Sequence, residues 1–190
     1  SYLKKIEQKC KVIYFHAFQP NPTYDSVVEG VQKFRQSNAK LIVAIGGGSA
    51  MDVAKCIKLF CNMNDDQLFL EQPIIPNNVH LIAMPTTAGT GSEVTNVSIL
   101  NLVSKGTKKG LAVDELYPDK AVLIPQLLDT LPFYVFATSS IDALIHGIES
   151  ALSPYANETT RMFSYRAIDI ILNGYKKIRA NGKDSVKCMY

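Results

Sequence analysis

Short apolar runs alternate with amphipathic stretches along the first half of the chain. The runs at Lys11–Phe15, Lys40–Ile45 and Val79–Met84 have the length and composition of buried strands. Between them, apolar residues recur with the helical period over Tyr24–Ser37 and Ser49–Phe60. Strands separated by single helices are joined by right-handed crossovers, so the sequence predicts a parallel α/β sheet covered by helices on both faces.

The pattern changes in the second half. Two strands, at 97–103 and 109–113, flank a polar, glycine-containing connection that is typical of a hairpin. A last short strand is expected at Ala121–Ile124. The chain then becomes helical throughout, which predicts an α/β domain at 1–133 followed by the beginning of an all-helical domain at 134–190.

Two helices are expected in this second domain. One spans Tyr134–Ser153, and the other spans Glu158–Arg179 with Asn157 as its N-cap. Asp184 is a candidate cap for a further helix.

Composition and charge exclude several classes of protein. An apolar content of 47% and a charged content of 19% exclude disorder and collagen. No apolar run approaches the roughly 18 residues of a membrane helix, and Ser1-Tyr2-Leu3-Lys4-Lys5 does not lead into a signal-peptide core. We therefore expect a cytoplasmic protein without a membrane partner. The net charge of +3 comes from scattered residues rather than a basic stripe, so nucleic acid is not an expected partner.

The cysteines point to structural thiols. Cys10, Cys56, Cys61 and Cys188 form no CxxC pair, and Cys56 and Cys61 lie inside a predicted helix. All four are expected to be free under cytoplasmic redox conditions.

Gly46-Gly47-Gly48-Ser49 lies where a predicted strand ends and a helix begins. Backbone N–H groups and the helix dipole at such a junction can bind a phosphate, and glycines let a pyrophosphate approach closely. The run is not the GxGxxG fingerprint, since Met51 stands where a glycine is required, and no P-loop lysine follows. The alternative is a tight turn in which Ser49 and Asp52 form a capping-box-like pair.

A second glycine-rich loop follows the next strand: Pro85-Thr86-Thr87-Ala88-Gly89-Thr90-Gly91-Ser92-Glu93. Loops at the carboxyl ends of neighbouring parallel strands meet over one crevice, where open α/β sheets bind ligands. Threonine hydroxyls can hydrogen-bond phosphate and ribose oxygens, whereas the alternative is a polar turn that caps the next segment. Together, the two loops favour a nucleotide.

Asp142, His146 and Glu149 are spaced by about one helical turn each. A carboxylate and an imidazole on one helix face suit a divalent metal, although the same spacing also occurs in ordinary surface pairs. His16 and His80 have no visible partners, and we expect them to pack in the core or at the sheet edge.

Four segments, in this order, resemble motifs of the iron-containing (group III) alcohol dehydrogenase family. They are Asn21-Pro22-Thr23, Gly46-Gly47-Gly48-Ser49-Ala50-Met51-Asp52-Val53-Ala54-Lys55, Pro85-Thr86-Thr87-Ala88-Gly89-Thr90-Gly91-Ser92-Glu93-Val94-Thr95, and Asp142-Ala143-Leu144-Ile145-His146-Gly147-Ile148-Glu149. The resemblance runs from about Lys11 to about residue 180. It implies an NAD- or NADP-dependent enzyme that interconverts a small alcohol with its aldehyde or ketone. The implied fold is a Rossmann-like dinucleotide-binding domain followed by a helical metal domain, as in the dehydroquinate synthase-like superfold.

The resemblance also implies roles for individual residues. The implied cofactor-binding residues are Asn21, Gly46, Gly47, Gly48, Ser49, Thr86, Thr87, Thr90 and Lys109. The glycine run would hold the pyrophosphate, and Lys109 would lie near the adenosine ribose, with Lys108 as a one-residue alternative. Asp142 and His146 would be the first two ligands of Fe²⁺, Zn²⁺ or another divalent ion, which would act as a Lewis acid on the alcohol oxygen.

The chain departs from the family pattern in three respects. The resemblance places the family's first strand upstream of Ser1 and its two remaining histidine ligands downstream of Tyr190. Ile124-Pro125 also replaces the family's Asp-Pro. Two metal ligands would bind a metal weakly, so one alternative is a catalytically incomplete nucleotide-binding fragment. A second alternative is a related enzyme of the same superfold, such as a polyol or glycerol dehydrogenase. An exposed sheet edge makes a homo-oligomer a reasonable hypothesis.

Overall fold

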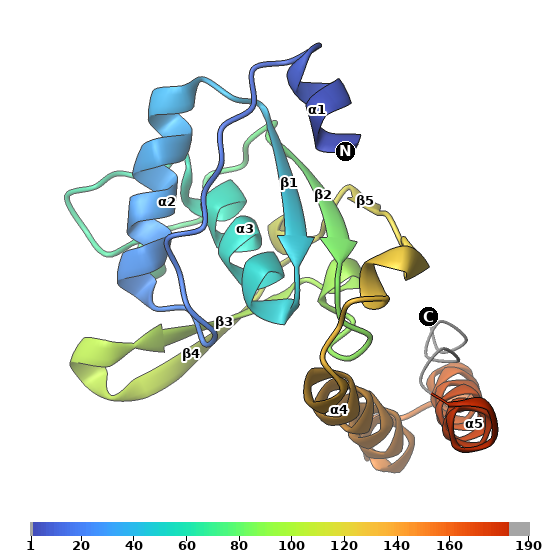
Figure 1. Ribbon diagram of the computed structural model, residues 1–190. Helices are drawn as coiled ribbons and strands as arrows, with labels where there is room; N and C mark the ends of the chain where they lie inside the picture. Colours follow the sequence, from blue (N-terminus) through green and yellow to red (C-terminus); the bar gives the residue numbers. More distant parts are fainter. Residues whose placement is uncertain (1, 183–190) are drawn as a thin grey trace.

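The computed structural model describes residues 2–182, and its order of elements confirms the predicted α/β fold followed by helices (Figure 1). The α-helices and strands are α1 (Tyr2–Glu7), α2 (Tyr24–Ser37), β1 (Leu41–Gly46), α3 (Gly48–Phe60), β2 (His80–Pro85), β3 (Val97–Leu102), β4 (Thr107–Ala112), β5 (Lys120–Ala121), α4 (Phe133–Leu152) and α5 (Glu158–Asn181). The 3-10 helices between them are η1 (Phe69–Glu71), η2 (Ser92–Val94), η3 (Val103–Lys105), η4 (Asp114–Leu116) and η5 (Pro125–Leu128).

Three parallel strands form the main sheet in the order β1-β2-β5. β1 and β2 pair along their whole length, so that Gly46 lies level with Pro85 at their carboxyl ends. β5 contains only two residues, fewer than the sequence predicts, although the N–H of Val122 still donates to β2. The chain then turns into η5 at Pro125, which cannot continue a strand ladder because it has no N–H.

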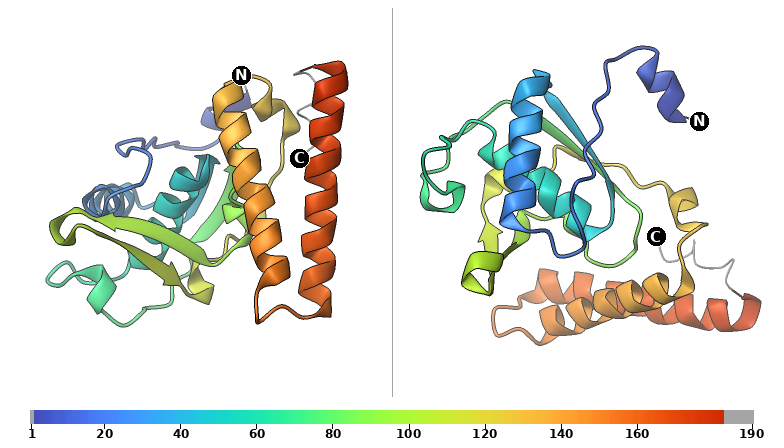
Figure 2. Two further views of the ribbon diagram at one scale, coloured as in Figure 1. Left: turned by 90° about the horizontal axis from the view of Figure 1, so that it is seen from below. Right: turned by 60° about the vertical axis from the view of Figure 1, so that its left-hand side comes forward.

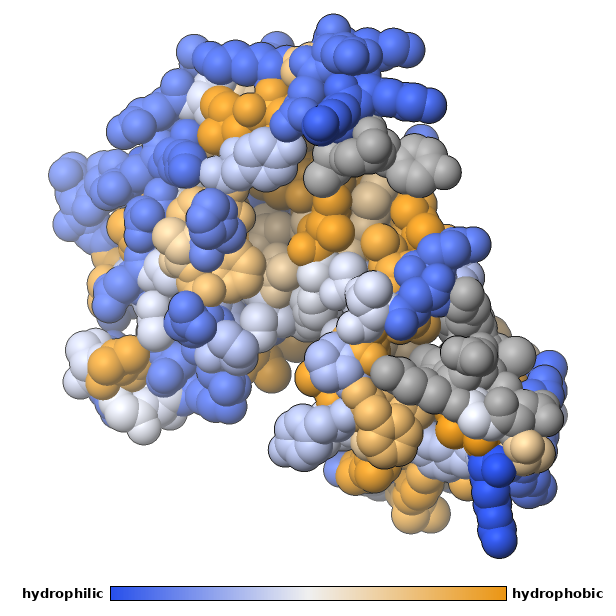
Figure 3. Space-filling view, viewed as in Figure 1, coloured by the Kyte–Doolittle hydropathy of each residue, from blue (hydrophilic) through white to orange (hydrophobic). Residues whose placement is uncertain are grey.

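α3 packs on one face of this sheet. The contact joins small and apolar residues of both: Ala44, Met51, Ala54, Leu81 and Ala83. The alternate residues of β1 point to the other face, where Leu41, Val43 and Ile45 remain about half exposed. Figure 3 shows apolar side chains at the surface over β1 and β2. The prediction of helices on both faces is therefore confirmed for one face only.

A larger core lies on the side of α3 that faces away from the sheet, where α3 packs against α2 and the β3–β4 hairpin. Its fully buried members include Val27, Val31, Cys56, Phe60 and Leu100. α2 has the predicted bounds because Thr23 caps its first turn by accepting from Ser26 N at 3.2 Å, and Asn38 ends it in a left-handed conformation. The antiparallel hairpin is also confirmed, although β4 begins two residues earlier than the sequence predicts.

α4 and α5 lie side by side beyond the carboxyl ends of β1 and β2 (Figures 1 and 2). α5 begins at the predicted cap, since Asn157 and Thr160 form a reciprocal capping box. Gly147 lets the helices approach closely, because a Cβ there would lie 3.1 Å from Ile168 Cγ1. No helix between residues 2 and 182 is long and apolar enough to cross a membrane.

The structure corrects the prediction at the N-terminus. Lys11–Phe15 is extended but is not a strand, and α1 precedes it. Phe15 instead packs against the large core, so its apolar character reflects burial rather than strand pairing. Cys10, Cys56 and Cys61 are free as expected. The predicted cap at Asp184 and the fourth cysteine, Cys188, lie outside the described residues.

Candidate functional site

The first glycine run forms a tight turn between β1 and α3. Gly46 has a φ of +156°, which favours glycine, and a Cβ there would lie 2.6 Å from Ala50 Cβ. Its carbonyl oxygen accepts a hydrogen bond from the N–H of Thr86 at 2.9 Å. α3 begins at Gly48 with Gly47 as its N-cap, and no side chain caps it. Its first N–H groups and its dipole can therefore receive an anion.

The threonine loop, residues 86–91 between β2 and η2, packs directly on this glycine turn. A Cβ at Gly47 would lie 3.3 Å from Thr87 Cγ2, and a Cβ at Gly48 would lie 3.0 Å from Thr90 Cγ2. The absence of side chains on both glycines therefore lets the two loops touch. They form one surface at the carboxyl ends of β1 and β2, as the sequence predicts (Figure 1).

Asn21 lies beside the glycine turn. Its N–H donates to Ser49 Oγ at 3.3 Å, and its left-handed φ of 59° is one that asparagine tolerates. Lys108 Nζ donates to Asn21 Oδ1 at 3.0 Å. Lys109 follows on β4 and points to the opposite face of the ribbon. Of the two candidate lysines, the structure brings Lys108, not Lys109, to this site.

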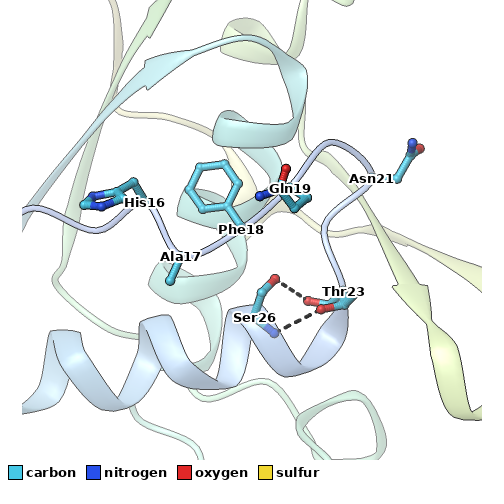
Figure 4. A pocket seen from close by; sticks show the side chains of 7 residues that line it. All are labelled: His16, Ala17, Phe18, Gln19, Asn21, Thr23 and Ser26. Carbon is cyan, nitrogen blue, oxygen red and sulfur yellow. Dashed lines mark hydrogen bonds between the residues drawn. The ribbon is translucent and has the colours of Figure 1, made fainter.

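A pocket of about 290 Å³ opens next to Asn21 (Figure 4). It is lined by His16, Ala17, Phe18, Gln19, Asn21, Thr23 and Ser26. Its volume is at the small end for ligand pockets, and its aromatic and polar lining suits one ring of a larger ligand. His16 lies exposed at this pocket, so the expectation of core packing is wrong.

Asp52 does not cap α3, contrary to the capping-box prediction. The helix already begins at Gly48, so Ser49 and Asp52 both lie within it. Asp52 instead turns inward and accepts a hydrogen bond from Ser92 Oγ at 3.4 Å. Burial raises the pKa of Asp52 to about 6, and the charge of Lys55 only partly opposes this shift.

We expect the Asp52 carboxyl to make folding less favourable as pH rises from about 4 to about 6. Its pKa is about 6 in the folded chain and near the ordinary 3.8 when unfolded, so the folded state binds the proton more tightly in this window. Above pH 6, the ionised carboxyl lowers the free energy of unfolding by about 3 kcal/mol. Urea unfolding at several pH values should show this loss in the wild type and not in Asp52→Asn. If the free energies of unfolding of the wild type and Asp52→Asn differ by the same amount at every pH between 4 and 6, the assignment is contradicted.

Asp142 and His146 share one face of α4, with Oδ1 and Nε2 3.9 Å apart and both side chains about half exposed. This part of α4 adjoins the threonine loop, because a Cβ at Gly89 would lie 2.8 Å from the Ser139 carbonyl oxygen. A carboxylate and an imidazole suit a divalent ion such as Fe²⁺ or Zn²⁺. Among residues 2–182, no third histidine, cysteine or acidic residue joins them, Glu149 included.

His80 has a partner that the sequence does not reveal. Its Nδ1 lies 3.0 Å from Asp119 Oδ1, and the other carboxylate oxygen accepts from the N–H of Leu81 at 2.7 Å. This pair lies at the amino end of β2, far along the strand from the two glycine loops. It links β2 to the segment before β5 and is structural.

Two family models match the chain. The model described as "Iron-containing alcohol dehydrogenase" matches residues 1–125, and the one described as "Fe-containing alcohol dehydrogenase family, C-terminal" matches residues 136–187.

Individual proteins agree with these matches. The chain is 41% identical to a 4-hydroxybutyrate dehydrogenase of Clostridium kluyveri over 186 residues, which are 96% of this chain and 50% of that protein. It is 34% identical to an NAD-dependent methanol dehydrogenase of Bacillus methanolicus over 179 residues, 91% of this chain and 46% of that one. The crystal structure of a sulfoacetaldehyde reductase from Bifidobacterium kashiwanohense in complex with NAD⁺ superposes with a TM-score of 0.88 at 27% identity, covering 99% and 52% of the two chains.

The chain thus spans about half the length of the relatives that it matches. The family models cover both its α/β part and its helical part, and the ordered glycine, threonine and Asp–His segments lie within them. The chain therefore belongs to the family of iron-containing alcohol dehydrogenases.

Proposed function

We propose that this chain belongs to an NAD(P)-dependent, divalent-metal-dependent alcohol dehydrogenase, which interconverts a small alcohol and its aldehyde or ketone by hydride transfer. The observation that carries the proposal is the contact between the glycine turn and the threonine loop at the carboxyl ends of β1 and β2. The names of the relatives, which include 4-hydroxybutyrate and methanol dehydrogenases, support a small alcohol as substrate.

The residues present fit a dinucleotide. The uncapped N-terminus of α3 offers N–H groups to a pyrophosphate, and the absence of side chains on Gly47 and Gly48 keeps Thr87 and Thr90 close to these groups. Ser49 and Asn21 lie beside this turn, with the Lys108 ammonium next to them. The hydroxyls of Thr86, Thr87 and Thr90 would line the other side of the bound molecule.

Asp142 and His146 would supply the first two ligands of the metal. When bound, the dinucleotide provides the hydride acceptor and the divalent ion provides Lewis acidity toward the alcohol oxygen. The part of α4 that carries the two ligands adjoins the threonine loop, which supports one continuous site for both groups.

We also propose that the chain divides into a dinucleotide-binding domain at 1–133 and a metal-binding helical domain that begins at 134. The change from the sheet to the α4–α5 pair supports this boundary, as do the limits of the two family models. The dinucleotide site lies on the first domain and the Asp–His pair on the second. Hydride transfer therefore requires both domains.

Calorimetric titration of the 190-residue chain with NAD⁺ and NADP⁺, with and without Fe²⁺ or Zn²⁺, tests the proposal beside an absorbance assay with 1-propanol. Because the described residues supply only two metal ligands, we expect this chain to bind dinucleotide without turning over alcohol. Such a result supports a nucleotide-binding fragment of the enzyme. Metal-dependent turnover would show that other residues or a second chain supply further metal ligands. Failure to bind either dinucleotide would contradict the proposed dinucleotide site.

Lys108 and Lys109 form a matched pair for testing the cofactor site. Lys108→Ala removes the cation next to Asn21, and we expect the Kd for NAD⁺ to rise about 5-fold, or about 1 kcal/mol. Lys109→Ala removes the same charge from the opposite face of β4 and should change the Kd by less than about 2-fold. Titrations at one ionic strength compare the two variants. A larger effect at Lys109 would reverse the assignment.

A further inference from the structure

Lys55 is a fully buried cation close to the glycine turn. Its side chain is 0% exposed, and Nζ donates to Ser92 Oγ at 2.8 Å, Thr95 Oγ1 at 3.1 Å and the Val97 carbonyl oxygen at 2.8 Å. An ammonium has three N–H groups, so these three acceptors satisfy it completely. Asp52, one turn earlier on α3, supplies a nearby negative charge.

Stability alone does not explain a lysine here. Taking an ammonium and a carboxylate out of water is costly, and an apolar side chain of similar size often serves a fold equally well. All three acceptors of Lys55 lie in one segment, from η2 to the start of β3. That segment directly follows the threonine loop, so the ammonium fixes the end of this loop to α3.

The threonine loop is therefore held at both ends. Its beginning is fixed by the bond from Thr86 N to the Gly46 carbonyl, and its end by Lys55. Between these points, the N–H of Ser92 donates to Thr90 Oγ1 at 3.3 Å, which orients that hydroxyl. Thr90 in turn packs against the backbone at the start of α3. A continuous set of contacts thus joins the buried ammonium to the dinucleotide surface.

We propose that Lys55 is a positioning residue of the dinucleotide site, which acts through Ser92 to hold Thr90 against the glycine turn without touching the dinucleotide. This inference rests on the proposed function. The proposed role of Lys55 is in cofactor affinity, although the side chain is buried inside the fold.

The first test is the affinity of the 190-residue chain for NAD⁺. Lys55→Met keeps the aliphatic part of the side chain and removes the ammonium, and we expect the Kd to rise about 10-fold. Lys58→Met is the matched control, because Lys58 lies three residues further along the same helix and bonds the Tyr117 carbonyl and Asp119 instead. The control should shift the Kd by less than about 2-fold, even where both variants lower the Tm.

A double-mutant cycle with Thr90→Val tests the path. If Lys55 acts through Thr90, adding Lys55→Met to the Thr90→Val chain should weaken NAD⁺ binding by less than about 2-fold. The same 10-fold loss in both backgrounds, or no loss in either, overturns the proposal. Should Lys55→Met not fold, Thr95→Val removes one acceptor and keeps the charge, and it should give about a 3-fold loss that likewise disappears with Thr90→Val.

Amide hydrogen exchange distinguishes failure of this inference from failure of the proposed function. Without any ligand, Lys55→Met should increase exchange over 86–95 and leave the rest of α3 protected, whereas Lys58→Met should not affect 86–95. If the wild-type chain fails to bind NAD⁺, the proposed function falls and exchange still reports on the anchoring. Unchanged exchange over 86–95 in Lys55→Met overturns the positioning role, whatever the wild type binds.

Discussion

Gly48→Val should weaken NAD⁺ binding by about 100-fold, or about 2.7 kcal/mol, while the chain remains folded. A Cβ at Gly48 would lie only 3.0 Å from Thr90 Cγ2, so a branched side chain must push the threonine loop away from the turn. The displaced loop would also carry the Thr90 hydroxyl away from the first N–H groups of α3, where a phosphate would bind. Both consequences act on the dinucleotide surface and leave the apolar cores beyond α3 intact.

Gly110→Val is the control for this substitution. Gly110 lies on β4, where no atom comes within 4 Å of an added Cβ, and valine favours a strand. The two variants introduce the same side chain, so titration with NAD⁺ and a thermal melt of each separate a specific loss from a general one. Equal affinities for Gly48→Val and the wild type would show that the turn does not hold the dinucleotide.

The α-helices from α2 onward could be predicted well because their determinants are local, whereas α1 is not predicted from the sequence. Thr23 and Asn38 give α2 its limits, and the Asn157 capping box gives α5 its start. The prediction fails at Lys11–Phe15, where an apolar run reads like a strand. Whether such a run joins a sheet depends on a partner strand elsewhere in the chain, and local composition carries no information about that.

The candidate site divides in the same way. The glycine and threonine loops could be placed from the order of strands and helices, since carboxyl ends of parallel strands meet at one edge. Asp52 is the instructive error, because its spacing from Ser49 satisfies a local capping rule that the helix start at Gly48 makes irrelevant. A signal was available, because Asp52 and Lys55 are two charges one turn apart among the otherwise apolar residues 50–57 of α3. Charges in such a stretch must find partners in the interior.

The Asp142–His146 pair is only partly explained by its spacing in the sequence. Spacing alone places Asp142 and His146 on one face of α4, and the structure adds that this face begins next to the threonine loop. At 3.9 Å the two side chains are too far apart for a direct hydrogen bond. The carboxylate and the imidazole would together hold a divalent ion between them.

We therefore expect the 190-residue chain to bind Zn²⁺ weakly, and His146→Ala to raise the Kd by at least about 10-fold, to the point where saturable binding is lost. A carboxylate alone competes poorly with water for the ion, whereas a carboxylate and an imidazole on one helix face bind it together. Titration with Zn²⁺ against a chromophoric chelator measures the loss, with NAD⁺ affinity unchanged as a check on folding.

His80→Ala is the matched control, because His80 also pairs with an aspartate but lies at the amino end of β2. If Asp142 and His146 form only an ordinary surface pair, His146→Ala should behave like this control. His146→Ala would then change the free energy of unfolding by no more than about 0.5 kcal/mol and leave the Zn²⁺ affinity unaltered. If His146→Ala loses Zn²⁺ binding and His80→Ala does not, then His146 is a ligand of the ion, as the proposed metal site on α4 requires.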